Sequence, residues 1–155
     1  MKDSCSKLFW VMALLAFVSV PSPVSSYDLT SYANVQEDGS LKVRGHIVHL
    51  YGIYIPPTER VCRTYVSPVR CGPRAVMQLE FKIDTHFVHC EEMERFSDGS
   101  ISAVCKVEGQ DLGAWMVQNG WALALPDAPF QYHALEKIAR TRGVGVWGTP
   151  VGGLP

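Results

Sequence analysis

The 155-residue sequence lacks a long apolar run, a Cys-x-x-Cys pair and any internal repeat or low-complexity segment. Its longest uncharged apolar stretch, residues 8–20, falls short of the roughly 20 residues that a membrane-spanning helix needs. A mature transmembrane helix is therefore excluded. The missing Cys-x-x-Cys spacing disfavours a zinc site. Without repeats, the length is that of one ordinary domain.

The sequence also lacks an excess of positive charge. Its formal net charge is −1, with 14 lysines and arginines against 15 aspartates and glutamates. Nonspecific nucleic-acid binders usually carry a positive excess, because neutralising phosphates supplies most of their affinity. The charge balance therefore disfavours a strong nucleic-acid binder.

The N-terminal segment has the pattern of a secretory signal. Two lysines precede the apolar run 8–20, prolines follow it, and the small residues Val24, Ser25 and Ser26 come next. We expect residues 1–26 to be cleaved, which places the protein outside the cell or in the periplasm, with no stable membrane insertion afterwards. Their loss changes the net charge to −2. An uncleaved N-terminal anchor is the alternative.

Four cysteines remain after residue 26, and an even number in an exported chain favours disulfides. Four cysteines allow three pairings. Cys62 and Cys71 bracket one loop, whereas Cys90 and Cys105 lie in two strand-like runs with a turn signal between them. We therefore predict the disulfides Cys62–Cys71 and Cys90–Cys105.

Local patterns predict an α+β domain with an antiparallel sheet curled into a barrel and helices outside it. A hairpin should turn at Arg44-Gly45, and a long loop covers 58–72. Asp111 should cap one helix, and Gly143 should end another, in which Phe130, Ala134 and Ile138 follow at four-residue spacing. The remaining predicted segments are a loosely ordered lead-in at 27–36, a helix from Pro73, strands at 86–90, 101–107 and 121–125, and a flexible tail at 149–155.

Three stretches together resemble the staphylococcal-nuclease-like (thermonuclease) family: "LYGIYIPP", "DLGAWMVQNGWALA" and "YHALEKIARTRGVGVWG". The resemblance covers about residues 37–148. It implies a five-stranded OB-fold β-barrel with about three helices. Exported members of this superfamily in some bacteria are associated with exopolysaccharide biosynthesis, so the resemblance also implies an envelope or polysaccharide role.

The family hydrolyses phosphodiesters with two arginines, a glutamate and calcium held by aspartates. The matching arginine positions here hold His49 and Ser100, and the glutamate position holds Pro57. The calcium positions hold Gly39 and Tyr54. We therefore expect no catalysis, no resident metal and no cofactor. The alternative is a secreted phosphodiesterase with a rearranged site, in which Glu59 and Arg60 substitute and calcium is retained.

Histidines also raise the question of a metal site. His46 and His49 are three residues apart on a predicted strand, as are His86 and His89 near the next one. Residues three apart on a strand face opposite sides of the sheet. This spacing disfavours a metal pair.

Arginines and tyrosines near the 58–72 loop form a candidate binding region. Arginines bind anionic groups, and tyrosines stack on bases or sugar rings. The region predicts a polyanion ligand, either a polysaccharide or a nucleic acid. In the alternative interpretation the tyrosines fill gaps and the arginines are dispersed, which leaves a structural or protein-binding role. The candidate binding residues are Tyr51, Tyr54, Arg60, Arg63 and Arg70.

Overall fold

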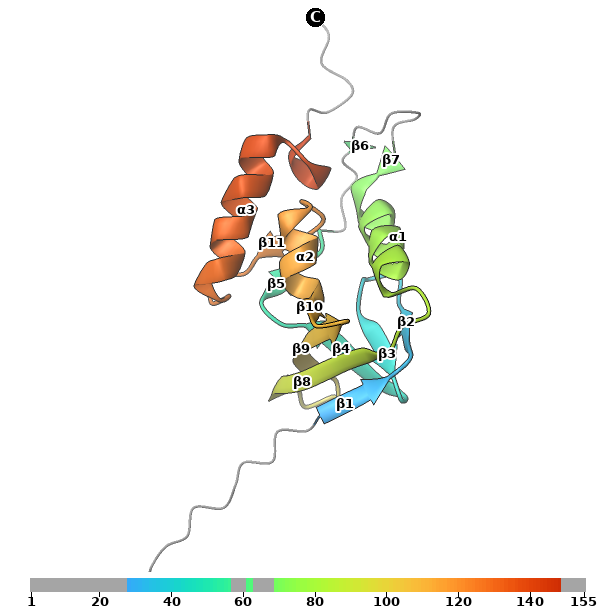
Figure 1. Ribbon diagram of the computed structural model, residues 1–155. Coiled ribbons are helices and arrows are strands. Elements are labelled where there is room, and N and C mark those ends of the chain that lie inside the picture. The colour runs from blue at the N-terminus through green and yellow to red at the C-terminus, as the bar shows by residue number, and fades with distance from the viewer. Residues whose placement is uncertain (1–27, 57–60, 63–68, 149–155) are drawn as a thin grey trace, which may run out of the picture.

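The computed structural model describes residues 28–56, 61–62 and 69–148 (Figure 1). Within these ranges, every helix is too short or too polar to span a bilayer. The elements are β1 (Asp28–Ser31), β2 (Ala33–Val35), β3 (Leu41–Val43), β4 (His46–Leu50), β5 (Ile53–Tyr54), β6 (Val61–Cys62), β7 (Val69–Arg70), α1 (Cys71–Ile83), β8 (Val88–Arg95), β9 (Ile101–Val107), β10 (Gln110–Asp111), α2 (Leu112–Gln118), β11 (Leu123–Ala124), α3 (Phe130–Arg142) and a short 3₁₀ helix, η1 (Gly145–Trp147).

The main sheet nearly closes on itself, so the predicted α+β barrel-like architecture is confirmed. Its strand order is β1-β8-β9-β4-β3-β2, and β10 pairs with β9. β1 and β2 are the two ends of this path, and only Tyr32 separates them in the chain. One continuous segment therefore pairs with β8 on one side and with β3 on the other. The sheet has seven strands rather than five, because the N-terminal segment supplies two and β10 adds another.

The expectation of a loosely ordered lead-in is wrong for residues 28–35. Leu29 is fully buried and pairs with Cys90 of β8, and Val35 pairs with Leu41 of β3. The segment shows little strand-like alternation in its sequence. Its order comes instead from two ladders of backbone hydrogen bonds, one to the distant strand β8 and one to β3, the next strand in the chain.

Both predicted hairpins are present. Arg44 and Gly45 have left-handed φ angles of 48° and 86°, which suit a two-residue turn between antiparallel strands. The second hairpin joins β8 to β9, and β8 extends to Arg95, beyond the predicted strand end. Cys90 faces Cys105 across this pair, and their disulfide is confirmed.

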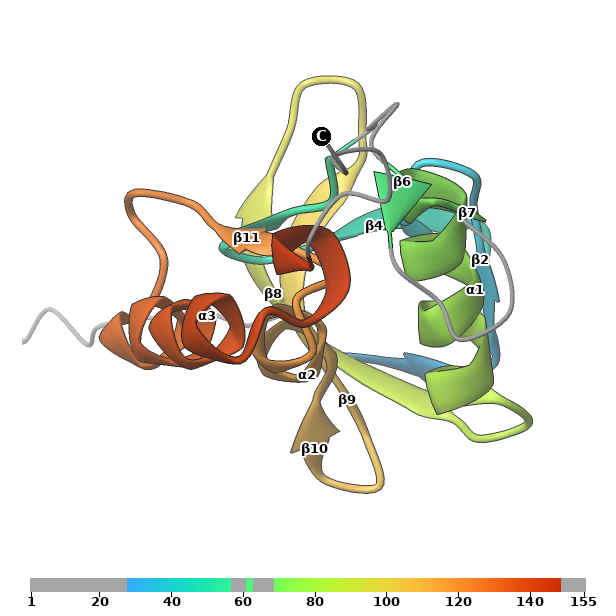
Figure 2. The same cartoon turned by 90° about the horizontal axis from the view of Figure 1, so that it is seen from above.

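Alternating residues of the strands face a core that α1 and α2 cover from outside (Figures 1 and 2). Helix α2 lies between α1 and α3 in both views. Asp111 caps α2 as predicted, because its Oδ1 accepts a hydrogen bond from the Ala114 N–H at 3.1 Å. The side chains that α1 and α2 bury are Cys71, Ala75, Leu79, Ile83, Leu112, Ala114, Met116 and Val117.

Helix α3 packs on α2 through Tyr132, Glu136 and Ala139, and it ends at Gly143 as predicted. The Tyr132 hydroxyl donates to Asp111 Oδ2 at 2.7 Å, so the carboxylate that caps α2 also holds α3. Burial, followed by this hydrogen bond, raises the pKa of Tyr132 well above its ordinary value. The hydroxyl is therefore a lasting donor to Asp111.

The predicted 58–72 loop contains a short antiparallel pair, β6 with β7, in which Cys62 is opposite Val69. Cys71 is disulfide-bonded. The side chain of Cys62 lies outside the described part of the chain. The Cys62–Cys71 pairing thus stays a prediction, and the β6–β7 register is compatible with it.

Candidate functional site

One cleft of about 310 Å³ collects three of the positions that the resemblance assigns to chemistry. Gly39 and Tyr54, at the calcium positions, line it together with His49, at the first arginine position. The described residues that line the cleft are Glu37, Asp38, Gly39, Ser40, His49, Leu50, Ile53, Tyr54, Ile55, Pro56 and Gly72. None of these is an arginine or a lysine.

Two short turns that have the same sequence, Asp-Gly-Ser, flank β4, the strand that carries His49. The first turn, 38–40, leads directly into β3, and the second, 98–100, leads directly into β9. Both strands flank β4: Val48 pairs with Leu41 in antiparallel register and with Ile101 in parallel register. The two turns therefore lie on opposite sides of β4 and extend from Val48 in opposite directions along it, the first beside His49 and the second beside Ile47.

The two turns have matching hydrogen bonds. Asp38 Oδ1 accepts from the Ser40 backbone N–H at 2.9 Å and from the Ser40 hydroxyl at 2.7 Å. Asp98 Oδ1 makes the same two bonds with Ser100, at the same distances. In each turn the bond from the serine hydroxyl, followed by the bond from its N–H, lowers the pKa of the aspartate below its ordinary value. Both carboxylates are therefore charged at neutral pH.

A second cleft, of about 240 Å³, adjoins the first at His49. Gly45, Asp98 and Ser100 are among the residues that line it. The His49 ring also meets the ring of Phe96 edge-on, with centroids 6.1 Å apart. A single imidazole thus lies between two carboxylate-bearing turns, and the described surface around it is more acidic than basic.

The structure brings together some of the predicted site residues and separates others. Tyr54 lines the first cleft and is 49% exposed. Tyr51 does not line it. Ser100 lines the adjoining cleft rather than the first. Pro57, Glu59, Arg60, Arg63 and the side chain of Arg70 lie outside the described residues.

The loop that carries these arginines begins and ends at the cleft. Pro56, just before the loop, and Gly72, just after it, both line the first cleft.

Sequence reasoning missed Asp38, Asp98 and Phe96 as site residues. The signal that could have found the two aspartates is the repeated Asp-Gly-Ser tripeptide, each time followed by an aliphatic residue that starts a strand. An aspartate that bonds the backbone two residues on is typical of such turns.

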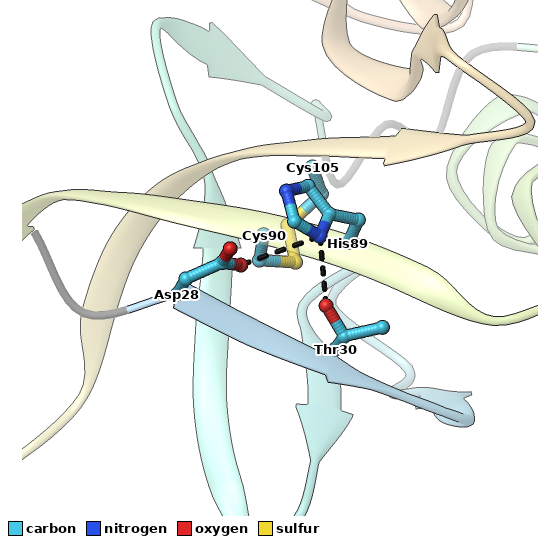
Figure 3. Close-up of a disulfide and its surroundings, with 5 residues drawn as sticks. All are labelled: Asp28, Thr30, His89, Cys90 and Cys105. Carbon is cyan, nitrogen blue, oxygen red and sulfur yellow. Dashed lines mark hydrogen bonds and ion pairs between the residues drawn. A yellow bond between two sulfur atoms is a disulfide. The ribbon is translucent and has the colours of Figure 1, made fainter.

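A histidine, a carboxylate and a hydroxyl also meet on the outer face of β1 and β8, near the Cys90–Cys105 disulfide (Figure 3). His89 Nδ1 lies 2.7 Å from Thr30 Oγ1 and 3.3 Å from Asp28 Oδ1. Both contacts use the same ring nitrogen. A catalytic triad needs the carboxylate on one nitrogen and the nucleophile on the other. We therefore interpret this cluster as a cross-strand contact.

The described residues contain no group of three or more histidine, cysteine, aspartate or glutamate side chains arranged to hold a metal ion. His86, one of the histidines considered above, lies with Nδ1 3.2 Å from the carbonyl oxygen of Ile83 and with Nε2 3.6 Å from Glu108 Oε1.

Replacing Ser40 with alanine should raise the pKa of Asp38 toward its ordinary value, because the serine hydroxyl bond is the largest cause of its lowering. The measurement is an NMR titration of the side-chain carboxyl carbons. A carboxyl group whose pKa is lowered in the folded state stabilises the fold at pH values above its ordinary pKa of about 3.9. This stabilisation is lost as the pH falls through the folded-state pKa. The free energy of unfolding should therefore fall less on acidification in the variant than in the wild type.

Ser100→Ala is the matched control, because it removes the equivalent bond from Asp98 alone. If Ser40→Ala left the pKa of Asp38 unchanged, the serine hydroxyl bond would not be the cause of the lowered pKa.

The chain matches no profile of a known protein family and no sequence among characterised proteins.

Proposed function

We propose that the chain is an exported, non-catalytic binding protein built on a staphylococcal-nuclease-like OB barrel, which holds a saccharide chain in the cleft beside His49. Its place of action would be the periplasm or the cell envelope. The observation that carries the proposal is that the cleft gathers Gly39, His49 and Tyr54 where the family's reaction needs arginine and carboxylates.

The sheet topology supports the OB assignment. If β1 and β2 are counted as one bent strand, and the short β10 is left aside, five strands remain in the cyclic order β1/β2, β3, β4, β9, β8. The turns 36–40 and 96–100 then join the first strand to the second and the fourth to the fifth. OB barrels bind oligonucleotides and oligosaccharides on the face of strands 2 and 3 and with these two loops. The first cleft is lined by the first of these turns and by His49 and Leu50 of the third strand, which agrees with this mode of binding.

The charge of the cleft supports a binding role without catalysis. Phosphodiester cleavage requires fixed positive groups next to the phosphate, where negative charge develops. Among the described residues that line the cleft, His49 is the only side chain able to carry a positive charge. An imidazole lacks the bidentate donor geometry of a guanidinium.

The same charges favour a saccharide over a nucleic acid. Glu37, Asp38 and Asp98 border the face around His49, and their carboxylates would repel phosphates. Carboxylates accept hydrogen bonds from sugar hydroxyls, and the exposed ring of Tyr54 offers a surface for a sugar ring.

Export is supported by the apolar run 8–20 and by disulfide chemistry. Cys90 and Cys105 are bonded to each other, and Cys71 is also disulfide-bonded. Disulfides persist mainly in oxidising compartments outside the cytosol.

The proposal is tested with the secreted protein and its cysteines oxidised. We expect isothermal titration to show binding of a neutral glucose hexasaccharide and weaker binding of an alginate hexasaccharide, because the carboxylates beside His49 would repel those of alginate. Tyr54→Ala should weaken this binding by about tenfold, because it removes the stacking surface. Tyr32→Ala is the matched control, since Tyr32 is 63% exposed but does not line the cleft.

A parallel experiment incubates the protein with single-stranded DNA and calcium to test for hydrolysis. Cleavage of the DNA would overturn the non-catalytic assignment. Flat titrations with both saccharides would overturn the ligand class, and equal losses in the Tyr54 and Tyr32 variants would overturn the assignment of the cleft.

A further inference from the structure

Helix α3 carries an apolar stripe on the side that faces away from the protein. Phe130, Ala134 and Ile138 follow at four-residue spacing, which places them on one side of a helix. Phe130 is 87% exposed and Ile138 is 43% exposed. Figures 1 and 2 show α3 at the outer edge of the molecule, beyond α2. The stripe is therefore open to solvent along the helix.

The exposed side of α3 is also positively charged, although the chain as a whole has a net charge of −1. Glu136 is the only carboxylate in the helix, and it is 9% exposed and bonded to Arg140 at 3.1 Å. Arg140 in turn lies over the ring of Trp147, 4.2 Å from its centroid. Lys137 and Arg142 are exposed and make no ion pair with another described residue. At 100° per residue, they flank the stripe on its two sides.

From this arrangement we propose that α3 docks on an anionic lipid bilayer, with Phe130 and Ile138 entering the interface and Lys137 and Arg142 meeting the head groups. Helices that lie on membranes combine an apolar side with flanking lysine or arginine residues in this way. The charge complementarity selects anionic lipid, which attracts each nearby basic residue.

The size and shape of the surface favour a bilayer over a protein partner. A stable protein interface buries about 800 Å² on each partner and needs a complementary shape. One helix of 13 residues with three apolar side chains offers less than that. A bilayer conforms to a convex helix and needs no preformed groove. A second copy of the chain would bring two positively charged helices together, which is unfavourable.

Docking through α3 would leave the His49 cleft free, because no residue of α3 lines that cleft. The protein would thus hold its ligand at the membrane surface. This inference does not depend on the identity of the ligand.

The first test is co-sedimentation of the protein, as processed by the cell, with two kinds of vesicle: phosphatidylcholine alone, and phosphatidylcholine mixed with phosphatidylglycerol. We expect binding to the mixed vesicles that falls as salt is raised. Phe130→Ser should weaken binding by roughly tenfold, and Lys137→Gln by about fivefold. Phe81→Ser is the matched control, because Phe81 is 70% exposed on α1. Equal losses in the Phe130 and Phe81 variants would overturn the proposal.

A second readout separates α3 from any retained N-terminal apolar segment, which would bind both kinds of vesicle. In the variant Phe130→Trp, brominated phosphatidylglycerol should quench the added fluorescence, and in Phe81→Trp it should not. Absence of quenching at position 130 would overturn the proposal. Sedimentation showing a dimer that Phe130→Ser dissolves would also overturn it, in favour of self-association.

Discussion

Replacing Gly120 with alanine should lower the free energy of unfolding by about 3 kcal/mol and the melting temperature by roughly 10 °C. Gly120 has a φ of 71°, a conformation that costs an L-residue about 1–2 kcal/mol. A Cβ at this position would also overlap the backbone of Val144. The chain passes so closely here that Gly120 O accepts a hydrogen bond from the Val146 N–H at 2.7 Å. The measurement is denaturant unfolding monitored by circular dichroism.

Gly109→Ala separates the two causes of this loss. Gly109 has a similar φ of 79°, but nothing lies within 4 Å of where its Cβ would be. The control should therefore show only the conformational cost of about 1–2 kcal/mol. Equal losses in the two variants would mean that the close approach to Val144 adds nothing.

Replacing both Cys90 and Cys105 with alanine should lower the free energy of unfolding by about 3 kcal/mol. The disulfide joins residues 15 apart in sequence, so its loss frees a loop of that size in the unfolded chain. The denaturant slope should rise as well, because the unfolded chain becomes less compact. Substitution is better than a reducing agent, since reduction would also open the disulfide of Cys71.

A second pair of substitutions, Cys90→Val with Cys105→Val, restores much of the side-chain volume in a site where both cysteines are fully buried. We expect the loss to persist, since valine brings no crosslink. Recovery of wild-type stability with valine would instead assign the effect to packing.

Much of the fold could be predicted from the sequence because its signals are local. The Arg44-Gly45 turn, the Asp111 cap and the Gly143 helix end each depend on a few neighbouring residues. The strands at 28–35 could not be predicted in the same way. Their order depends on partners such as Cys90, about 60 residues away, and their own residues show no clear alternation.

The candidate site was predictable only in part. The resemblance assigned calcium binding and phosphate contact to the positions that hold Gly39, His49 and Tyr54 here. The structure places these three residues around one cleft. Tyr51 was expected beside them, but β4 ends at Leu50 and the chain turns, so strand alternation does not extend to it. The matched Asp-Gly-Ser turns became visible as one site only through the parallel pairing of β4 with β9.

The near-closure of the sheet through β1 and β2 has a consequence for how the protein folds and for how it can misfold. Residues 28–31 are synthesised well before residues 88–91, with which they pair. Contacts this distant in sequence slow folding, because a long loop must close before they form. Until then β8 is an unpaired edge, and such edges can pair with another chain. Truncating this segment should therefore promote aggregation even though the core residues of β3, β4 and β9 remain.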